Sequence, residues 1–278
     1  MLTKASFILT TLLLVTLSAH QAMAEAKFQK VLTIIFENTD YKKALSQPYF
    51  SELAQNGALL ENYYAVTHPS QGNYIALTSG SIQGVTNDSN VNLDVTHIGD
   101  LLEAQGRTWK TYAEDFPGNC YLKSSKGSYA RKHVPFISYT NVQSNPTRCD
   151  LIQDQKSFDN DVQNQSLPNY SFYVPNLKND GHDTGVSYAD KWLKTKFGNL
   201  FKDPQFMSGM LVIITFDEGS NSKNQVYTVL LGDSVKSGVK SSTTYNHYSL
   251  LRLIEDEWGL GNLGLNDQSA TQISGIWK

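Results

Sequence analysis

Residues 30–38 read KVLTIIFEN, a nearly unbroken run of apolar and β-branched side chains that ends in two polar residues. A strand with one solvated face would alternate apolar and polar residues, so this run predicts a strand buried on both faces of a sheet. Residues 48–57, PYFSELAQNG, then have helical spacing with Gly57 in the position of a C-terminal cap, and residues 58–66, ALLENYYAV, again predict a strand. The chain therefore starts with the order strand, helix, strand.

The same alternation continues along the rest of the chain. Helices are predicted at residues 97–106, 187–201 and 247–260, and strands at residues 107–115, 169–176, 210–218 and 226–232. Helices that alternate with apolar strands indicate an α/β protein with a mostly parallel sheet covered on both faces. No internal repeat or linker interrupts the pattern, so residues 25–278 are predicted to form a single domain with one large core.

The first 24 residues form a separate pattern. Lys4 precedes the apolar run FILTTLLLVTL and the small-residue sequence Ala22-Met23-Ala24. This layout is typical of a secretory signal peptide, with cleavage expected after Ala24, and it predicts a secreted or periplasmic protein. An uncleaved anchor is the alternative. The apolar run is short for a bilayer span, however, so we expect no stable membrane span.

The composition argues against one class of partner and indicates a disulfide bond. The formal net charge is −3, and nothing in the sequence suggests the basic patch that binds nucleic acid. The two cysteines, Cys120 and Cys149, are expected to pair in an oxidising compartment. Their spacing matches no metal-binding signature, so we expect no redox or metal role for them.

Polar side chains follow four of the predicted strands. Ligands bind beyond the carboxyl ends of the strands in parallel sheets. These ends carry Glu37-Asn38, Asp217-Glu218, Ser70 and, in the loop after Asn176, the residues Asp180, His182 and Asp183. Each group alone can be explained as a helix cap or an Asx-turn. Four such groups at one edge of a sheet instead predict a functional site.

Ser70 lies in residues 63–80, YYAVTHPSQGNYIALTSG, between a predicted strand and a helix that begins near Asn73. Two roles are open for it. The hydroxyl can cap the helix, or the turn can hold the hydroxyl out for reaction. Pro69 restricts the approach to this turn, and Gly72 lets the backbone come close to a bound anion.

The side chains at the strand ends suit a divalent cation. Oxygen ligands favour calcium, magnesium or manganese, while participation of a histidine would admit zinc. The candidate ligands are Glu37, Asn38, Ser70, Asp217 and Glu218. A cation on the Ser70 oxygen would lower the pKa of the hydroxyl and make it a strong nucleophile. The start of the helix and the Asn73 amide would then face a phosphate, so the pattern predicts phosphoryl or sulfuryl transfer.

Five motifs link the sequence to a known family. They are, in chain order, ENTDY at 37–41, HPSQGNYIALTSG at 68–80, NDGHDTG at 179–185, ITFDEG at 214–219 and YNHYSLLRLIEDEWGLG at 245–261. In this order they resemble the phosphoesterase family of acid phosphatases and bacterial-type phospholipases C, in the alkaline phosphatase superfamily. The resemblance implies a three-layer α/β/α sandwich and a covalent phospho-enzyme.

The resemblance also assigns roles to individual residues. Ser70 matches the metal-bound nucleophile, and Asn73 matches an asparagine that contacts a phosphoryl oxygen. The matches to metal-binding positions are Glu37, Asn38, Asp217 and Glu218. Two-metal members of the superfamily have Asp-His where this chain has Asp217-Glu218, and their earlier loop has a different spacing. One metal ion is therefore as well supported as two.

The histidines divide into site candidates and structural candidates. We expect His182 to donate a proton to the leaving group, and Asp183 and His247 to contact the substrate, with a second-metal role open for all three. His133 is expected to contact the substrate phosphate, with Arg131 and Lys132 beside it as further cations for an anionic substrate. His68 is expected to hold the turn before Ser70, and His97 to be a surface or capping residue.

These features favour a secreted, metal-dependent phosphomonoesterase of the acid phosphatase type. It would act on a small phosphate ester through a phosphoserine at Ser70. A phospholipase C or another phosphodiesterase on the same core is the nearest alternative, although the phospholipase relatives usually carry extra segments. An exported protein that holds metal and phosphate without turnover is a second alternative, but such a protein has no need for an activated hydroxyl.

Overall fold

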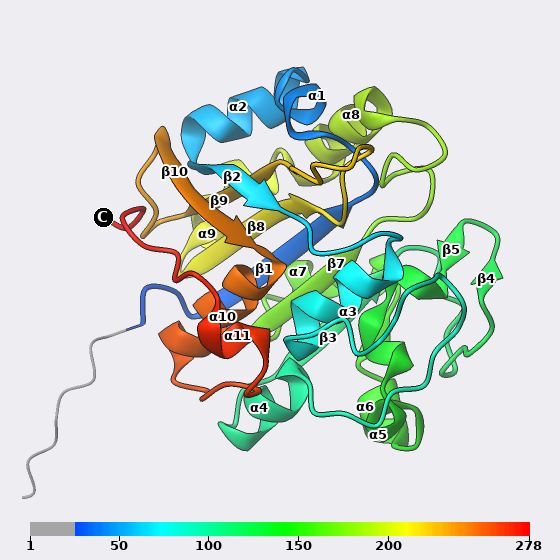
Figure 1. The fold of residues 1–278 in the computed structure, drawn as a ribbon. Coiled ribbons are helices and arrows are strands. Elements are labelled where there is room, and N and C mark those ends of the chain that lie inside the picture. The colour runs from blue at the N-terminus through cyan, green and yellow to red at the C-terminus, as the bar shows by residue number, and fades with distance from the viewer. Residues whose placement is uncertain (1–25) are drawn as a thin grey trace, which may run out of the picture.

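A single eight-stranded sheet forms the centre of the protein (Figure 1). The computed structural model describes residues 26–278, so the predicted signal segment 1–24 lies outside the described residues. The strands are β1 (Lys30–Phe36), β2 (Ala58–Tyr64), β3 (Trp109–Ala113), β6 (Ile152–Gln153), β7 (Tyr170–Val174), β8 (Met210–Phe216), β9 (Thr228–Gly232) and β10 (Val239–Asn246). Their spatial order is β10-β2-β9-β8-β1-β7-β3-β6, and only β9 runs antiparallel to its neighbours. The predicted mostly parallel sheet is confirmed.

Helices cover both faces of this sheet and complete the predicted α/β/α sandwich (Figure 1). One layer contains α1 (Tyr41–Leu45), α2 (Pro48–Asn56), α7 (Gln155–Gln163) and α8 (Val186–Phe197). The other contains α3 (Gln71–Ser79), α4 (Ile98–Ala104), α10 (His247–Trp258) and α11 (Asn266–Ser269). Shorter elements are the hairpin β4 (Ser125–Lys126) and β5 (Tyr129–Ala130), the helices α5 (Thr140–Gln143), α6 (Pro146–Cys149) and α9 (Pro204–Met207), and the 3₁₀ turns η1 (Arg131–His133), η2 (Pro135–Ser138) and η3 (Leu200–Lys202). Within residues 26–278, no helix has the length and apolar character needed to cross a membrane.

Strand β1 lies at the centre because both of its faces are apolar. It pairs in parallel with β8 on one side and with β7 on the other. Its last residue, Phe36, packs edge-on against Phe50 of α2 and Trp192 of α8, with ring centroids 5.3 and 5.9 Å apart. Burial of one such aromatic side chain stabilises the fold by about 1.5–3 kcal/mol. The packing fixes the point where β1 leaves the sheet, and with it the position of the polar residues that follow.

Gly57 ends α2 for a reason other than the predicted one. Its backbone is extended, with φ −127°, so it does not adopt the left-handed conformation of a helix-capping glycine. A Cβ atom at this position would instead lie 2.4 Å from the backbone oxygen of Leu230 in β9. Glycine is needed because the chain enters β2 directly against its neighbouring strand.

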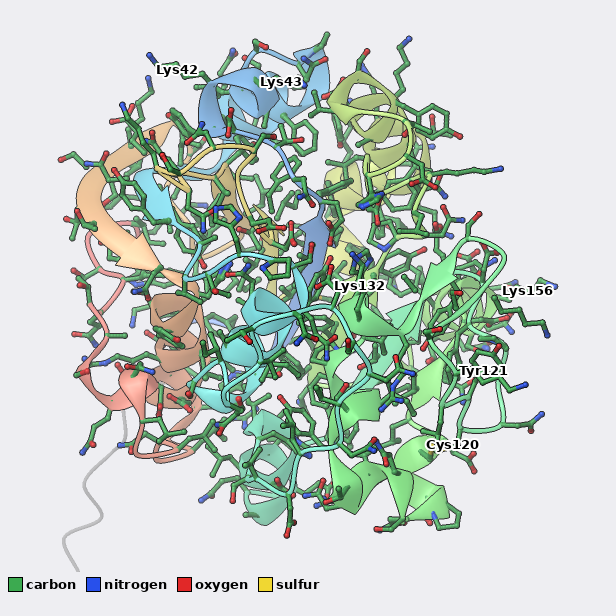
Figure 2. All side chains as sticks on the ribbon, turned by 45° about the vertical axis from the view of Figure 1, so that its right-hand side comes forward. Lys42, Lys43, Cys120, Tyr121, Lys132 and Lys156 are labelled. Atoms are coloured by element: carbon green, nitrogen blue, oxygen red, sulfur yellow. A yellow bond between two sulfur atoms is a disulfide. The ribbon has the colours of Figure 1, made fainter. Side chains whose placement is uncertain are left out.

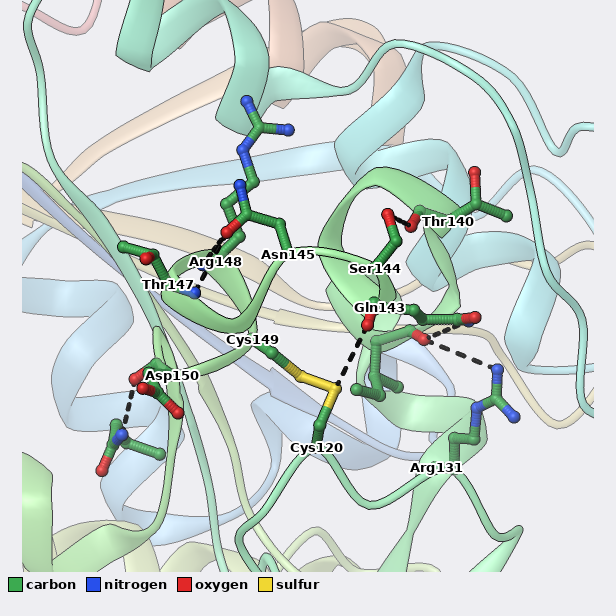
Figure 3. The surroundings of a disulfide bond; sticks show 12 residues. Cys120, Arg131, Thr140, Gln143, Ser144, Asn145, Thr147, Arg148, Cys149 and Asp150 are labelled. Atoms are coloured by element: carbon green, nitrogen blue, oxygen red, sulfur yellow. Dashed lines mark hydrogen bonds between the residues drawn. A yellow bond between two sulfur atoms is a disulfide. The ribbon is translucent and has the colours of Figure 1, made fainter.

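The predicted disulfide is confirmed and joins the loop after β3 to the end of α6 (Figure 3). Cys120 follows β3 and Cys149 ends α6, with a sequence separation of 29 and a Cα–Cα distance of 5.5 Å. A cross-link that closes a loop of this size stabilises the folded state by about 3–4 kcal/mol in the chain-entropy description. The disulfide thus ties down the otherwise irregular chain before η1.

The C-terminal end of α3 is held by α10 and α11. Gly80 caps α3 with a left-handed φ of 70°, and a Cβ atom added at this position would lie 2.2 Å from the Asp267 carboxylate. That carboxylate accepts the N–H groups of Leu263 and Leu265.

Glu255 of α10 is buried, and among the described residues neither of its carboxyl oxygens has a hydrogen-bond partner. Burial, followed by repulsion from Asp267 and Asp256, raises the pKa of Glu255 to about 8, against a smaller opposing effect of Arg252.

This environment of Glu255 predicts a pH-dependent stability. The carboxyl group titrates near pH 4.5 when unfolded and near pH 8 when folded, so the unfolded state loses its proton first and stability falls between these two values. We expect the Tm of Glu255→Gln to fall less than that of the wild type across this range. The effect of the substitution on the free energy of unfolding should be about 1–3 kcal/mol more favourable at pH 8 than at pH 4. Thermal melts at a series of pH values measure this, with part-exposed Glu52→Gln as the control. Parallel pH profiles for wild type and Glu255→Gln would contradict the assignment.

Candidate active site

The polar residues after β1, β7 and β8 meet because these strands are neighbours with aligned ends. Phe36 pairs with Phe216 at the ends of β1 and β8, and the Asp217 N–H donates to the Phe36 carbonyl at 2.8 Å. On the other side, the Glu37 N–H donates to the carbonyl of Asp180 at 3.0 Å. The side chains of Glu37, Asp180 and Asp217 are all buried. Three acidic residues far apart in the sequence therefore share one edge of the sheet.

Ser70 joins this group from the turn between β2 and α3. It is 2% exposed, and in the described structure its side chain makes no capping bond to α3. Its hydroxyl instead lies 3.1 Å from Oε2 of Glu37 and 3.0 Å from Oε1 of Glu218. A hydroxyl carries one proton, so it can donate to only one of these carboxylates at a time. The geometry does not match a helix cap, and it places Oγ between two acids.

Asn38, Glu218 and His68 form the outer part of the site. Asn38 has a left-handed φ of 25°, which asparagine tolerates better than most residues, and its backbone N–H donates to Asp217 Oδ1 at 3.1 Å. Its side-chain amide donates to Glu218 Oε1 at 3.0 Å. The other Glu218 oxygen contacts Nδ1 of His68, a half-exposed imidazole two residues before Ser70. His68 thus contacts an acid of the site from the turn before Ser70.

Glu37 is the best-compensated of the buried acids. The Tyr74 hydroxyl donates to its Oε1 at 2.8 Å, and Nε2 of His133 lies 3.0 Å from the same oxygen. Burial alone would raise the pKa of Glu37. The charge and hydrogen bond of His133, the Tyr74 hydroxyl and the charge of Lys132 together outweigh it and lower the pKa to about 2. Glu37 is therefore ionised.

Asp217 and Asp180 lack such compensation. Burial, followed by repulsion from Glu37 and Glu218, raises the pKa of Asp217 well above its ordinary value, and its Oδ2 has no hydrogen-bond partner within residues 26–278. Burial and the charge of Glu37 likewise raise the pKa of Asp180 to about 9. His133, whose Nδ1 lies 3.6 Å from Asp180 Oδ2, is placed between Glu37 and Asp180. The site therefore holds more acidic groups than its own cations neutralise.

His182 and Asp183 lie in the exposed loop after β7. Nδ1 of His182 lies 2.7 Å from Oδ1 of Asp183, and the His182 ring centroid is 6.4 Å from that of His133. The backbone N–H of His182 donates to the Asp180 carboxylate at 2.8 Å, which ties the loop to the buried part of the site. His182 is thus an accessible imidazole at the border of the acidic cluster.

His247 and Asn73 lie below the site, with their polar atoms bound to protein groups. His247 is fully buried, and burial lowers its pKa to about 4, so the ring is neutral. Its Nε2 lies 2.7 Å from the Asp217 carbonyl and its Nδ1 2.9 Å from the Tyr63 hydroxyl, so Nε2 donates and Nδ1 accepts. In this conformation neither nitrogen is left for the substrate contact that we expected.

Asn73 shows the same difference between expectation and geometry. Its side-chain oxygen accepts the N–H groups of Val66 and Thr67, and its amide nitrogen donates to the Thr67 carbonyl at 3.0 Å. The side chain is fully buried. Asn73 therefore holds the turn before Ser70, and in this conformation its amide is engaged by the backbone and not left for the phosphoryl contact that we expected.

The side chains of Arg131 and Lys132, which precede His133, point in different directions. The Arg131 guanidinium is buried and donates to the carbonyls of Leu122 and Val91, so it joins loops and does not face the site as we expected. Lys132 donates to Asp88 at 2.8 Å and lies near the carboxyl end of β1, whereas Lys42 and Lys43 lie at the periphery (Figure 2). The charge of Lys132 acts on Glu37, Asp180 and Asp217. Lys132 is the cation of this segment that faces the acids.

His97 accepts the Gly99 N–H and caps α4, as predicted, but its side chain is fully buried and not at the surface. Sequence reasoning missed Tyr74 and underrated His68. One signal for Tyr74 was available, because residues four apart lie on the same face of a helix and Tyr74 is four residues after Ser70. The signal for His68 was its place two residues before Ser70 in the turn.

The side chains of the site are of the types that bind a cation, but in the described structure they are not arranged around a common point. Within residues 26–278, no three His, Cys, Asp or Glu side chains are arranged around a common point as metal ligands. Oxygens of Glu37 and Glu218 are engaged by Ser70 and Asn38. The buried Asp217 Oδ2, which has no partner in the described region, and the surplus of carboxylates nevertheless fit a hard divalent cation.

Comparison with known proteins agrees with the motifs. The chain is 39% identical to the "Probable acid phosphatase" of Kluyveromyces lactis, over 89% of this chain and 62% of that protein. It is 33% identical to the "Phosphatidylinositol-3-phosphatase" of Mycobacterium tuberculosis, over 92% of this chain and 85% of that protein. The chain thus spans less than two thirds of the length of its fungal relative.

A solved structure shows the fold that the chain shares, and a family profile shows its family. A protein of the alkaline phosphatase superfamily from Vibrio parahaemolyticus has the same fold, with a TM-score of 0.59 and 14% identity, over 90% of this chain and 72% of that one. At this identity the likeness concerns the fold alone. The profile described as "Phosphoesterase family" matches residues 29–261. The resemblance read from the five motifs is confirmed, and the chain belongs to the phosphoesterase family.

Proposed function

We propose that the protein hydrolyses phosphate monoesters by way of a phosphoserine at Ser70. One observation carries the proposal: the Ser70 hydroxyl is buried between the carboxylates of Glu37 and Glu218, with no capping bond to α3 in the described structure. Nucleophilic serines need a neighbouring group that takes the proton or stabilises the alkoxide. Relatives named as acid phosphatases support the reaction class.

A divalent cation is part of this proposal. Glu37, Asn38, Ser70, Asp217 and Glu218 would hold it, since they are the oxygen donors that surround Oγ. Once bound, it would lower the pKa of the Ser70 hydroxyl and offset the charge of the buried acids. Oxygen ligation favours magnesium, manganese or calcium over zinc.

The residues of the chain perform two displacements at phosphorus. In the first, Ser70 Oγ transfers its proton to Glu37 or Glu218 and forms the Oγ–P bond while the bond from phosphorus to the ester oxygen breaks. His182, the exposed imidazole at the border of the site, gives a proton to the departing oxygen. In the second, a water oxygen bonds to phosphorus and gives a proton to His182 while the Oγ–P bond breaks. Oγ recovers the proton held by Glu37 or Glu218, which regenerates Ser70, and inorganic phosphate is released.

The remaining residues of the site bind the substrate phosphate or hold neighbouring groups in position. Lys132 and His133 are the basic side chains nearest the acids, so we assign the substrate phosphate to them. Asp183 orients His182 through their hydrogen bond. His247 supports the Asp217 carbonyl, and Asn73 supports the turn before Ser70.

Export and substrate preference complete the proposal. The signal-like segment before Ala24 and the disulfide fit a secreted or periplasmic enzyme. The mycobacterial relative that this chain covers over most of its length is named for a monoester of a lipid headgroup, which favours monoesters over diesters. A panel of p-nitrophenyl phosphate, its bis-ester and phosphatidylcholine tests the preference. Faster turnover of the two diesters would assign the protein to the phosphodiesterases.

The role of Ser70 predicts a large effect on turnover and a small one on stability. We expect Ser70→Ala to lower kcat for p-nitrophenyl phosphate by about 10³-fold or more, because the covalent route is lost. The free energy of unfolding should change by less than about 1 kcal/mol, since no capping bond is removed. Ser79→Ala, in the same helix, is the matched control. An active Ser70→Ala enzyme, with no phosphoserine adduct in acid-quenched wild type by mass spectrometry, would refute the mechanism.

The proposed cation site predicts a joint loss of metal and activity. We expect Glu37→Ala or Asp217→Ala to abolish tight metal binding and turnover together, because each change removes one anionic ligand. Elemental analysis of protein prepared without chelators measures the metal, and the same samples are assayed before and after chelation. Asp233→Asn, at the end of β9, is the control. Full activity of either variant at low metal concentration would reduce these acids to structural residues.

A further inference from the structure

The irregular segment between α3 and α4 passes over the start of α3. Its Asp88 is part-exposed, with 31% of the side chain accessible. One carboxylate oxygen accepts the Gln71 N–H, the first of α3 and next in sequence to Ser70, at 3.1 Å. The other oxygen accepts Nζ of Lys132 at 2.8 Å. A single carboxylate therefore bridges the start of the nucleophile's helix and the lysine of η1.

The bridge to Asp88 matters because Lys132 is assigned to the substrate phosphate. A lysine side chain has many rotamers, and part of this rotamer entropy is lost when it binds a phosphate. The Lys132 side chain is 21% exposed. Asp88 accepts a hydrogen bond from one of the three N–H groups of its ammonium group, which leaves two N–H groups for a ligand. A partner that holds the ammonium group before the substrate arrives lowers the entropy cost of binding.

The second contact of Asp88 fixes where the ammonium group is held. Because the Gln71 N–H belongs to the backbone, the Asp88 carboxylate is anchored to the turn that carries Ser70. The Asp88 carboxylate thus links the Lys132 ammonium group to the backbone next to Ser70. A phosphorus atom under attack must lie about 3–3.5 Å from Oγ, so a cation tied to the same turn is suitably placed for the phosphoryl oxygens.

We propose that Asp88 is a positioning residue that sets the affinity of the site for phosphate by holding Lys132 in place. This inference rests on the proposed function, because it takes Lys132 as a phosphate contact. It differs from a simple cap of α3, which would act on stability and not through Lys132. It also differs from simple repulsion, since a carboxylate that only repelled phosphate would weaken binding with or without the lysine.

A double-mutant cycle on inorganic phosphate binding separates these cases. The variants are Asp88→Asn, Lys132→Met and the double variant, with Asp88→Glu as the conservative replacement and Asp94→Asn, in the same segment, as the control. We expect Asp88→Asn to weaken phosphate binding and raise KM about 5–10-fold with kcat changed less than about threefold, as for loss of ground-state binding. The Asp88→Asn change should have no further effect when Lys132 is already Met, and Asp88→Glu should restore part of the affinity.

Four outcomes decide the matter. Independent effects of the two changes, or a lower Tm as the only effect of Asp88→Asn, would make Asp88 an anchor of the segment and overturn the inference. Tighter phosphate binding by Asp88→Asn in both backgrounds would show repulsion and overturn it as well. Wild type that binds phosphate with this coupling but hydrolyses no ester would refute the proposed function and leave the inference standing. Wild type that binds no phosphate would overturn both.

Discussion

The in-register pairing of β1 with β8 is the constraint on which the site depends. Phe36 and Phe216 end the two strands side by side, so Glu37 and Asp217 must both leave the sheet into a buried space. Acidic groups placed together in such an environment raise one another's pKa, as the Asp217 carboxyl shows. The turn η1 supplies Lys132 and His133 as compensating groups beside these acids.

Ser70 depends on this acidic centre for its environment. The helix α3 is fixed at its C-terminal end by Gly80 against Asp267, and at its start by Asn73 and Asp88. With the helix fixed at both ends, Oγ is directed toward Glu37 and Glu218, away from the N–H groups that a capping serine would use. The residues that stabilise the turn thus also set the direction of the hydroxyl.

Sequence reasoning succeeded where a residue's role follows from its immediate neighbours. Strands β1, β2, β3, β7, β8 and β9, the position of α4, the cysteine pair and the strand-end acids were readable because apolar runs, capping residues and loop positions carry local signals. It failed for β10, whose sequence VKSSTTYN has no apolar run and lies mostly exposed at the edge of the sheet. It also failed for the direction of Arg131, Asn73 and His247, because short-range patterns do not specify which side of a loop or helix a polar group faces.

The sequence by itself determined the α/β architecture, the family and the set of acids beyond the strands, because each depends on residue type and order along the chain. The tertiary structure alone decided that Ser70 meets Glu37 and Glu218, and that His68 and Tyr74 contact the same acids. It also decided that Asp88 joins Lys132 to the start of α3. These contacts join residues from separate elements, and their distances follow from sheet register and helix packing, which no local stretch of sequence encodes.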